Sequence, residues 1–256
     1  MILYLKKLII YIFSLLPDFF LKKLEQIFLI SRGKGYNFSL NAEFRNVIKL
    51  INKVEVFIDI GANEGSYTDL ILEKFPKAKG YLFEPNTVMH RLLKKKYKNF
   101  NITVFNEALS NRKGYERLYL EKKTGRSTII KRRLDHFNIK FEKNYKIKVN
   151  LMSEVFKKNI NSDVDFCKID IEGNEFNCLK GFRDIIKKFK CIQFEFNGCN
   201  IDSRIFFQDF WYFFKKINFE LYRITPSGPL LIKNYTEEDE NFSMNNYLAI
   251  NKIYIN

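Results

Sequence analysis

The sequence predicts an α/β fold in which a mainly parallel sheet is covered by helices on both faces. Apolar runs of strand length alternate with segments of helical periodicity from residue 54 to residue 217. No internal repeat and no Gly/Ser- or Pro-rich linker divides the 256 residues, a length that fits one domain with short additions. Such an alternation buries both faces of a parallel sheet. We therefore expect one α/β domain over residues 51–256, with an antiparallel strand at one edge.

Each element follows from the apolar runs and from their β-branched and aromatic content. The expected strands are Val54–Ile60, Gly80–Phe83, Ile102–Asn106, Phe166–Ile171 and Cys191–Phe196. The expected helices are Ser66–Phe75, Val88–Tyr97, Glu175–Phe182 and Phe206–Ile217. At the edge, an antiparallel hairpin is expected from Glu220–Ile224 and Tyr247–Ile253. Residues 111–150 are basic and poorly periodic, and we interpret them as an insertion or a substrate-facing loop.

Residues 1–50 are expected to form a helical extension with a break at Ser31–Gly35. Its apolar run Leu8–Leu16 stops at Pro17, so it is shorter than the roughly 20 apolar residues that span a bilayer. The run also lacks the small-residue cleavage site of a signal peptide. Lysines flank the apolar stretch, and residues 1–25 suit an amphipathic segment on a membrane surface. Packing against the domain or a partner subunit is the alternative.

Charge and cysteine content bound the partners and the compartment. The formal net charge is +15, and residues 112–148 alone carry thirteen Lys/Arg against four Asp/Glu, a net of +9. Such a surface favours phosphorylated substrates, anionic lipid or nucleic acid, although a solvated face explains it equally well. Four cysteines show no CxxC or zinc spacing: Cys167, Cys178, Cys191 and Cys199. They are expected to be reduced thiols of a cytoplasmic protein.

The turn after the first strand is the most informative motif, with the sequence DIGANEG at residues 59–65. Ligands of open parallel sheets bind beyond the carboxyl ends of the strands. Gly61 would let the backbone approach a ligand, and Gly65 would permit tight helix–strand packing. The pyrophosphate motif G-x-G-x-x-G and the P-loop are absent, which disfavours a nicotinamide-dependent oxidoreductase. The acid Asp59 suits the ammonium of S-adenosylmethionine (SAM), a nucleoside without phosphate, whose carboxylate the loop amides can meet.

The next two strand ends carry groups suited to the rest of this cofactor. Glu84 follows the second strand, where a carboxylate can accept hydrogen bonds from both ribose hydroxyls, and Asn86 is close by. The third unit ends near Asn106, and the small residue Ala108 leaves room for an adenine ring. Each motif alone also suits a structural turn with a solvated acid. Their order at successive strand ends favours a SAM site.

The fourth strand gives the strongest catalytic signal. Strand alternation sends Lys168, Asp170 and Glu172 to one side, where three charges cannot all be buried without partners. We therefore expect them to pair or to gather at the ligand-facing end of the strand. The fifth strand repeats the pattern with Gln193, Glu195 and Asn197.

The segments DIGANEG, FEPN, NEALS and KIDIEGNEFNCLKG resemble the FkbM family of SAM-dependent methyltransferases, from about Val54 to Phe196. The resemblance implies a class I methyltransferase Rossmann-like fold and O-methylation of sugars or polyketide-type products. It further implies that residues 59–65, among them Ala62 and Asn63, hold the methionine part of SAM. By the same resemblance Glu84 and Asn86 hold the ribose, and residues 106–108 border the adenine. Asp170 and Glu172 would line the reaction site. Glu64 stands where many members have an aliphatic residue, which a helix N-terminus tolerates.

For the reaction we expect Asp170 or Glu172 to orient or deprotonate an acceptor hydroxyl. Lys168 is expected to pair with these carboxylates rather than act as a base. Of the two histidines, His90 is interpreted as structural, and His136 in the basic insertion is a weaker catalytic candidate. No metal site is expected, although Asp170 could join Glu195 and Asn197 around a divalent cation.

The acceptor is expected to be a small molecule or a glycan, and we lean towards a sugar hydroxyl of a cell-surface polysaccharide. A nucleic-acid methyltransferase is the first alternative because of the charge, but residues 170–173 read Asp-Ile-Glu-Gly and lack the [DN]-P-P-[YF] signature of amino-nitrogen methylation. A non-catalytic scaffold in envelope assembly is the second alternative, which the intact acids disfavour. The sequence therefore predicts a cytoplasmic SAM-dependent O-methyltransferase that contacts the inner face of the membrane if residues 1–25 dock there.

Overall fold

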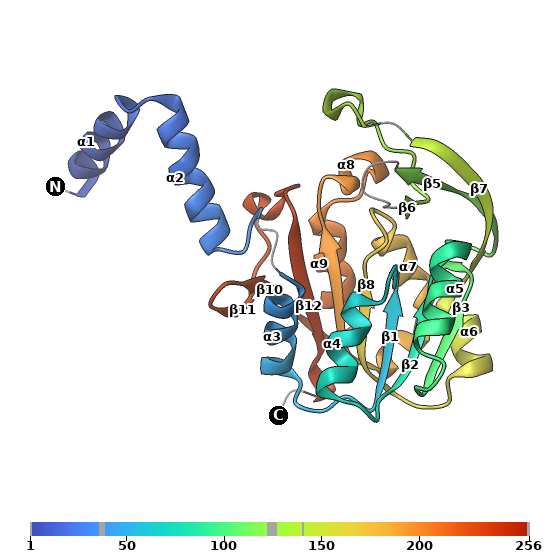
Figure 1. The fold of residues 1–256 in the computed structure, drawn as a ribbon. Coiled ribbons are helices and arrows are strands. Elements are labelled where there is room, and N and C mark those ends of the chain that lie inside the picture. The colour runs from blue at the N-terminus through green and yellow to red at the C-terminus, as the bar shows by residue number, and fades with distance from the viewer. Residues whose placement is uncertain (1, 36–38, 122–126, 140, 255–256) are drawn as a thin grey trace.

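The computed structural model describes residues 2–35, 39–121, 127–139 and 141–254. Figure 1 shows an α/β domain and, beside it, two helices that stand away from the domain. Residues 122–126 and 140 of the basic segment lie outside the described residues. The predicted α/β class with a mainly parallel sheet is confirmed.

Within the described chain the main sheet has eight strands in the order β11-β10-β12-β9-β8-β1-β2-β3. The parallel part consists of β1 (Val56–Ile60), β2 (Lys79–Phe83), β3 (Ile102–Phe105), β8 (Val164–Ile169) and β9 (Phe189–Phe196). The antiparallel part consists of β10 (Phe219–Thr225), β11 (Gly228–Leu231) and β12 (Asn245–Asn251). The predicted antiparallel pair is present as β10 and β12, but β11 occupies the edge.

Helices cover both faces of this sheet, as the alternation predicts. One face is packed by α3 (Leu40–Leu50), α4 (Ser66–Lys74) and α5 (Thr87–Lys96). The other face is packed by α6 (Met152–Asn159), α7 (Glu175–Phe182) and α9 (Phe207–Lys216). The four cysteines are free and buried. Shorter helical turns complete the chain: η1 (Asp135–Phe137), η2 (Arg183–Lys188), α8 (Cys199–Ser203), η3 (Glu237–Asp239) and η4 (Lys252–Tyr254).

The basic segment, residues 111–150, contains strands rather than one open loop. Together with β4 (Ala108–Leu109), a second sheet is formed by β5 (Gly114–Glu121), β6 (Ser127–Thr128) and β7 (Phe141–Asn150). The long strands β5 and β7 pair antiparallel, and a small hydrophobic cluster of Leu118, Ile147 and Val149 packs beneath them. This sheet stands at the carboxyl end of the main sheet (Figure 1).

Residues 2–31 are helical, up to the predicted break, apart from a short turn between the two helices. They form α1 (Ile2–Ser14) and α2 (Asp18–Ser31), and α2 has no buried residue. The helix α2 ends in a Schellman motif, in which the Gly33 N–H donates to Ile30 and the Lys34 N–H donates to Leu29. Gly33 has a φ of +73°, and a Cβ atom there would lie 2.1 Å from the Ile224 carbonyl oxygen. This glycine therefore fixes where the two helices leave the domain.

Candidate active site

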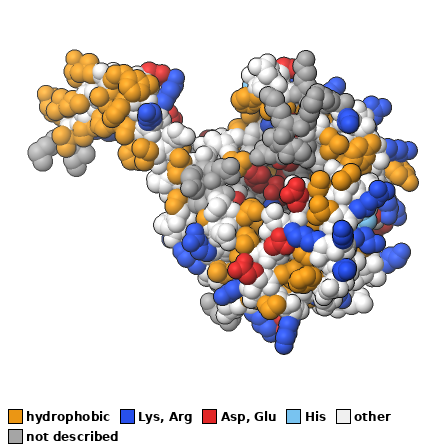
Figure 2. Space-filling model, viewed as in Figure 1, with side chains coloured by type: hydrophobic (Ala, Val, Ile, Leu, Met, Phe, Trp, Pro, Cys, Tyr) orange, Lys and Arg blue, Asp and Glu red, His pale blue; other side chains and the backbone are white. Residues whose placement is uncertain are grey.

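A cavity of about 820 Å³ lies beyond the carboxyl ends of β1, β2, β8 and β9, where open α/β sheets bind ligands. Residues from β4 to β6 form its opposite wall. Its acidic lining residues are Glu43, Glu84, Glu107, Asp170, Glu172 and Glu195. Figure 2 shows acidic side chains near the middle of this side of the domain, with Lys and Arg mostly around its edge. A basic protein thus holds an acidic cavity.

The turn after β1 has no room for side chains at its glycines. Gly61 has a φ of +86°, and a Cβ atom there would lie 2.0 Å from the carbonyl oxygen of Asp170. Gly65 has a φ of +82°, and its Cβ atom would lie 2.3 Å from the Tyr97 hydroxyl. Gly61 and Asn63 line the cavity, whereas Gly65 and the buried Ala62 hold the turn against its neighbours. At Gly61 the turn after β1 therefore exposes its backbone, without a side chain, to a ligand in the cavity.

Asp59 lies beneath this cavity and is not among its lining residues. It is buried on β1, and its Oδ2 atom accepts a hydrogen bond of 2.7 Å from the Thr68 hydroxyl, while Oδ1 has no hydrogen-bond partner. Burial raises the pKa of Asp59, and the positive charge of Lys168, its neighbour across the β1–β8 pair, opposes this shift. The structure therefore places Asp59 between α4 and Lys168, below the residues that line the cavity.

Lys168 is the cation at the centre of a buried polar network. Its Nζ atom lies 2.5 Å from Asp170 and 5.1 Å from the centre of the Tyr67 ring. Burial would lower the pKa of Lys168, but Asp170, Asp59 and Glu43 outweigh it and raise that pKa. The side chain therefore stays charged, and it pairs with Asp170 as the sequence predicts.

Glu84 is fixed at the end of β2 by backbone donors. Its two carboxylate oxygens accept hydrogen bonds of 2.8 Å from the Asn63 and Asn86 N–H groups. Burial, partly offset by these hydrogen bonds, raises the pKa of Glu84 to about 7. Asn86 caps α5 through Val88 and Met89, and Asn106 donates to the carbonyl oxygens of residues 84 and 85. Glu84 and Ala108 line the cavity, whereas Asn86 and Asn106 lie outside it and support the Glu84 loop.

The acids after β8 and in β9 face the same cavity. Glu172 has a φ of +54°. Its carboxylate accepts a hydrogen bond of 3.2 Å from the Cys199 thiol, and its backbone carbonyl oxygen accepts one from the Thr128 hydroxyl. Burial, together with the carboxylates of Asp170 and Glu172, raises the pKa of Glu195. The structure therefore brings Asp170, Glu172 and Glu195 together, and Asn197 lines the cavity with them.

Glu43 on α3 is a cavity residue that sequence reasoning missed. It accepts hydrogen bonds from Gln193 at 3.0 Å and from Asn246 at 3.3 Å, and burial raises its pKa to about 7. Glu43 shares the buried side of α3 with Phe44 and Val47. A charge on the apolar side of an amphipathic helix was the signal that could have found it.

The remaining candidates do not line the cavity. His90 is half-buried on α5, and burial lowers its pKa. His136 is exposed in η1, where its ring lies 4.2 Å from that of Phe137. Across the part of the chain that the structure describes, no group of three or more His, Cys, Asp or Glu residues could hold a metal ion.

The sheet and its cavity define a class of protein. A mainly parallel α/β sheet with a glycine turn after its first strand and carboxylates at successive strand ends is a class I SAM methyltransferase fold. Residues 59–223 match the family described as the methyltransferase FkbM domain, and the chain belongs to this family. The match confirms the family that the four sequence segments predict.

Solved structures similar to this chain include methyltransferases bound to S-adenosylhomocysteine. TrmK from M. capricolum has 14% identity and a TM-score of 0.46, and the match covers 85% of this chain and 69% of that chain. An O-methyltransferase from Bacillus cereus has 12% identity and a TM-score of 0.43, with 92% of each chain covered. No curated protein matches the sequence. At these identities and TM-scores the likeness assigns no acceptor.

Proposed function

We propose that this protein is a cytoplasmic SAM-dependent O-methyltransferase whose acceptor is a hydroxyl group of a sugar or cell-surface glycan. One observation carries the proposal: Glu84, held by two backbone N–H groups, shares one cavity with Asp170, Glu172 and Glu195. The first acid suits a ribose diol and the other three suit an acceptor hydroxyl. In this proposal SAM binds at the end of β2, and the proton of the acceptor is taken at the ends of β8 and β9.

The cavity residues fit SAM. Gly61 leaves its backbone open to a ligand, Glu84 offers carboxylate oxygens to the ribose hydroxyls, and Ala108 leaves room beside them for the adenine. The volume of about 820 Å³ lies within the range of small-molecule sites. We assign Asn63 to the same contact surface, and we assign Asp59 to holding the turn from below.

When bound, SAM would supply a methyl group for transfer to a nucleophile, and S-adenosylhomocysteine would leave as a neutral thioether that takes the electrons of the broken carbon–sulfur bond. The residues of this chain orient the acceptor and take its proton: as the hydroxyl oxygen gains the methyl group, its proton passes to a carboxylate of Asp170 or Glu172. Lys168 pairs with one carboxylate oxygen of Asp170 at 2.5 Å and so holds this side chain in place, and the carboxylate can also accept a hydrogen bond from the hydroxyl. Glu195, whose pKa is raised, is suited to exchange a proton with them.

The lining of the cavity supports a polyhydroxyl acceptor over a nucleic acid. Carboxylates and amides can bind sugar hydroxyls as acceptors and donors. A phosphate backbone needs cations, and Arg45 is the one basic residue among the described residues that line the cavity. If calorimetry detects no binding of SAM, the alternative function as a non-catalytic scaffold would be favoured.

The variants Asp170→Asn and Glu172→Gln test the catalytic roles. Loss of the proton acceptor should lower the rate of methyl transfer to a glycan extract by about 100-fold, with SAM affinity retained. Glu154→Gln is the matched control, because Glu154 pairs with Lys113 on the surface. Full rates in both site variants would exclude these roles, and transfer of labelled methyl groups to RNA would exclude the glycan.

A further inference from the structure

The two N-terminal helices form an apolar projection without a protein partner in the described structure. Figure 2 shows hydrophobic side chains over most of its visible surface. Every side chain from Tyr4 to Leu15 is exposed, and thirteen large apolar side chains between Tyr4 and Phe28 are exposed in all. We call α1 and α2, residues 2–31, the N-terminal hairpin. An exposed apolar patch of this size marks a surface that binds a membrane or another molecule.

The charges of the hairpin suit an anionic bilayer. Lys6 and Lys7 are the charged residues of α1. On α2, Lys22 and Lys23 are balanced by Asp18 and Glu25, so the positive charge of the N-terminal hairpin is concentrated on α1. Long lysine side chains can reach lipid head groups while their stems lie along apolar surface. The chain as a whole has a net charge of +15, which adds attraction to anionic lipid.

The distribution of apolar residues favours lipid over a second copy of the chain. On α1 the adjacent lysines occupy one sector, and apolar residues such as Leu8, Ile12 and Phe13 occupy the rest. A paired helix would cover one side of α1 and leave its other apolar sides in water, whereas a helix at the membrane interface can bury a wide apolar sector among acyl chains and keep its lysine sector at the head groups. No described helix is long and apolar enough to cross a membrane. The hairpin is therefore suited to lie in the bilayer surface.

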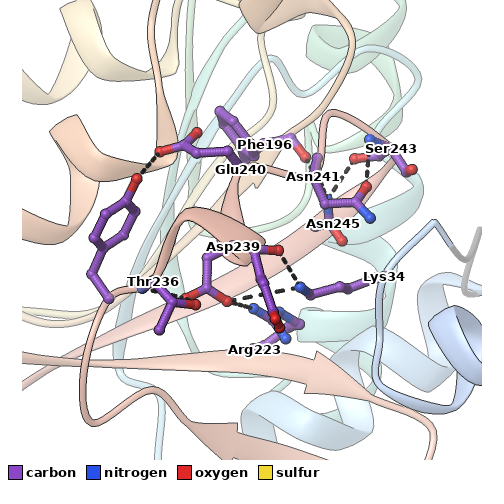
Figure 3. Close-up of polar contacts among 11 residues, drawn as sticks. Lys34, Phe196, Arg223, Thr236, Asp239, Glu240, Asn241, Ser243 and Asn245 are labelled. Carbon is purple, nitrogen blue, oxygen red and sulfur yellow. Dashed lines mark hydrogen bonds and ion pairs between the residues drawn. The ribbon is translucent and has the colours of Figure 1, made fainter. Parts of the chain in front are cut away.

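The N-terminal hairpin is attached to the domain through ion pairs and hydrogen bonds of Lys34. Lys34, directly after α2, is buried, and its Nζ atom donates to the Glu238 carbonyl oxygen and lies 3.9 Å from Asp239. Arg223 reaches the same carboxylate at 2.6 Å, and Figure 3 shows both cations turned toward Asp239. These contacts hold the base of the hairpin on β10 and η3.

Described residues next to this attachment line the cavity. The Gly35 N–H donates to the carbonyl oxygen of Met244 at 3.1 Å, and Met244 lines the cavity. Ser39 and Leu40, at the start of α3, line it too. The base of the N-terminal hairpin therefore adjoins residues that line the cavity.

We propose that the N-terminal hairpin docks on an anionic membrane surface and that the acceptor of methyl transfer is a hydroxyl compound held in that membrane by a lipid. The docking itself is independent of catalysis, whereas the acceptor class rests on the proposed function. Confinement to the same surface raises the effective concentration of such an acceptor at the cavity.

Vesicle co-sedimentation of the full chain tests the docking. The protein should sediment with vesicles of equal parts phosphatidylglycerol and phosphatidylcholine, and less with phosphatidylcholine alone. Tyr11→Glu, at a side chain that is 63% exposed on α1, should lower the bound fraction about tenfold. The matched control is Tyr212→Glu on α9, where the side chain is 58% exposed, and it should bind like the wild type.

Equal sedimentation of the Tyr11→Glu and wild-type proteins would overturn the docking. A second result would also overturn it. In that result neither the wild-type protein nor Tyr11→Glu binds vesicles, and light scattering shows that the wild type is a dimer and Tyr11→Glu a monomer. Labelled methyl groups from SAM, offered to membrane and soluble fractions of the source cells, should enter the organic-solvent extract of the membranes. Label confined to soluble glycans would overturn the acceptor class, whereas absence of SAM binding by calorimetry would overturn the proposed function and leave the docking result standing.

Discussion

Gly61→Ala tests whether the turn after β1 seats the cofactor. A Cβ atom at residue 61 would lie 2.0 Å from the Asp170 carbonyl oxygen, whereas real Cβ atoms essentially never approach closer than 3.0 Å. The turn or the end of β8 must therefore retreat by 1.0 Å. A left-handed φ for alanine costs about 1–2 kcal/mol in addition. Because a misplacement of about 1 Å can lower a rate by roughly 100-fold, we expect a loss of that size in methyl transfer.

Gly114→Ala separates the backbone strain from the clash. Gly114 has a φ of +144°, but no atom lies within 4 Å of its Cβ position. It therefore shares the unfavourable backbone and lacks the collision. The assay is the rate of methyl transfer with SAM affinity from calorimetry, and a thermal melt establishes that each variant is folded. A Gly61→Ala enzyme as active as Gly114→Ala would refute the assignment of the turn.

Three further perturbations probe the support of the site. Lys168→Met should lower the free energy of unfolding by about 3 kcal/mol in urea titrations, because it leaves Asp170 and the buried Asp59 without their cation, and an unchanged midpoint would contradict this. Burial raises the pKa of Glu84 from 4.5 to about 7, so its ionisation should remove up to about 3 kcal/mol of stability as pH rises through that range. Glu84→Gln should flatten this pH dependence in denaturant titrations, and a slope equal to that of the wild type would count against it. Asn86→Ala should cost about 1 kcal/mol through the lost helix cap while SAM affinity by calorimetry stays near that of the wild type, and a large loss of affinity would show a direct contact.

The strand ends of the candidate site were predictable because strand and helix periods differ so clearly in this chain. The segments around Glu84 and Asp170 lie at the carboxyl ends of β2 and β8 as expected, and both side chains line the cavity. Asp59 precedes the last residue of β1, so strand alternation turns it toward α4 and beneath the cavity. The cap role of Asn86 had a signal too, since asparagine directly before a helix is a preferred N-cap.

Other parts depend on contacts between residues distant in the sequence. Glu43 reaches the site through Gln193, 150 residues further along the chain, and one sequence carries no direct record of such a contact. The pairing of β5 with β7 was missed because β5 has no regular alternation of exposed and buried residues. Its partner follows 20 residues after β5 ends, and part of that interval lies outside the described residues.

The separate packing of β5 and β7 has a consequence for how the cavity can vary. Leu118, Ile147 and Val149 make a cluster apart from the two that hold the main sheet. Leu118 also lines the cavity, and so do residues of β6 that pair with β5. Substitutions in β5 and β6 can therefore reshape this wall without repacking the rest of the interior. The shape of this wall can thus vary independently of the strand ends that carry Glu84 and Asp170.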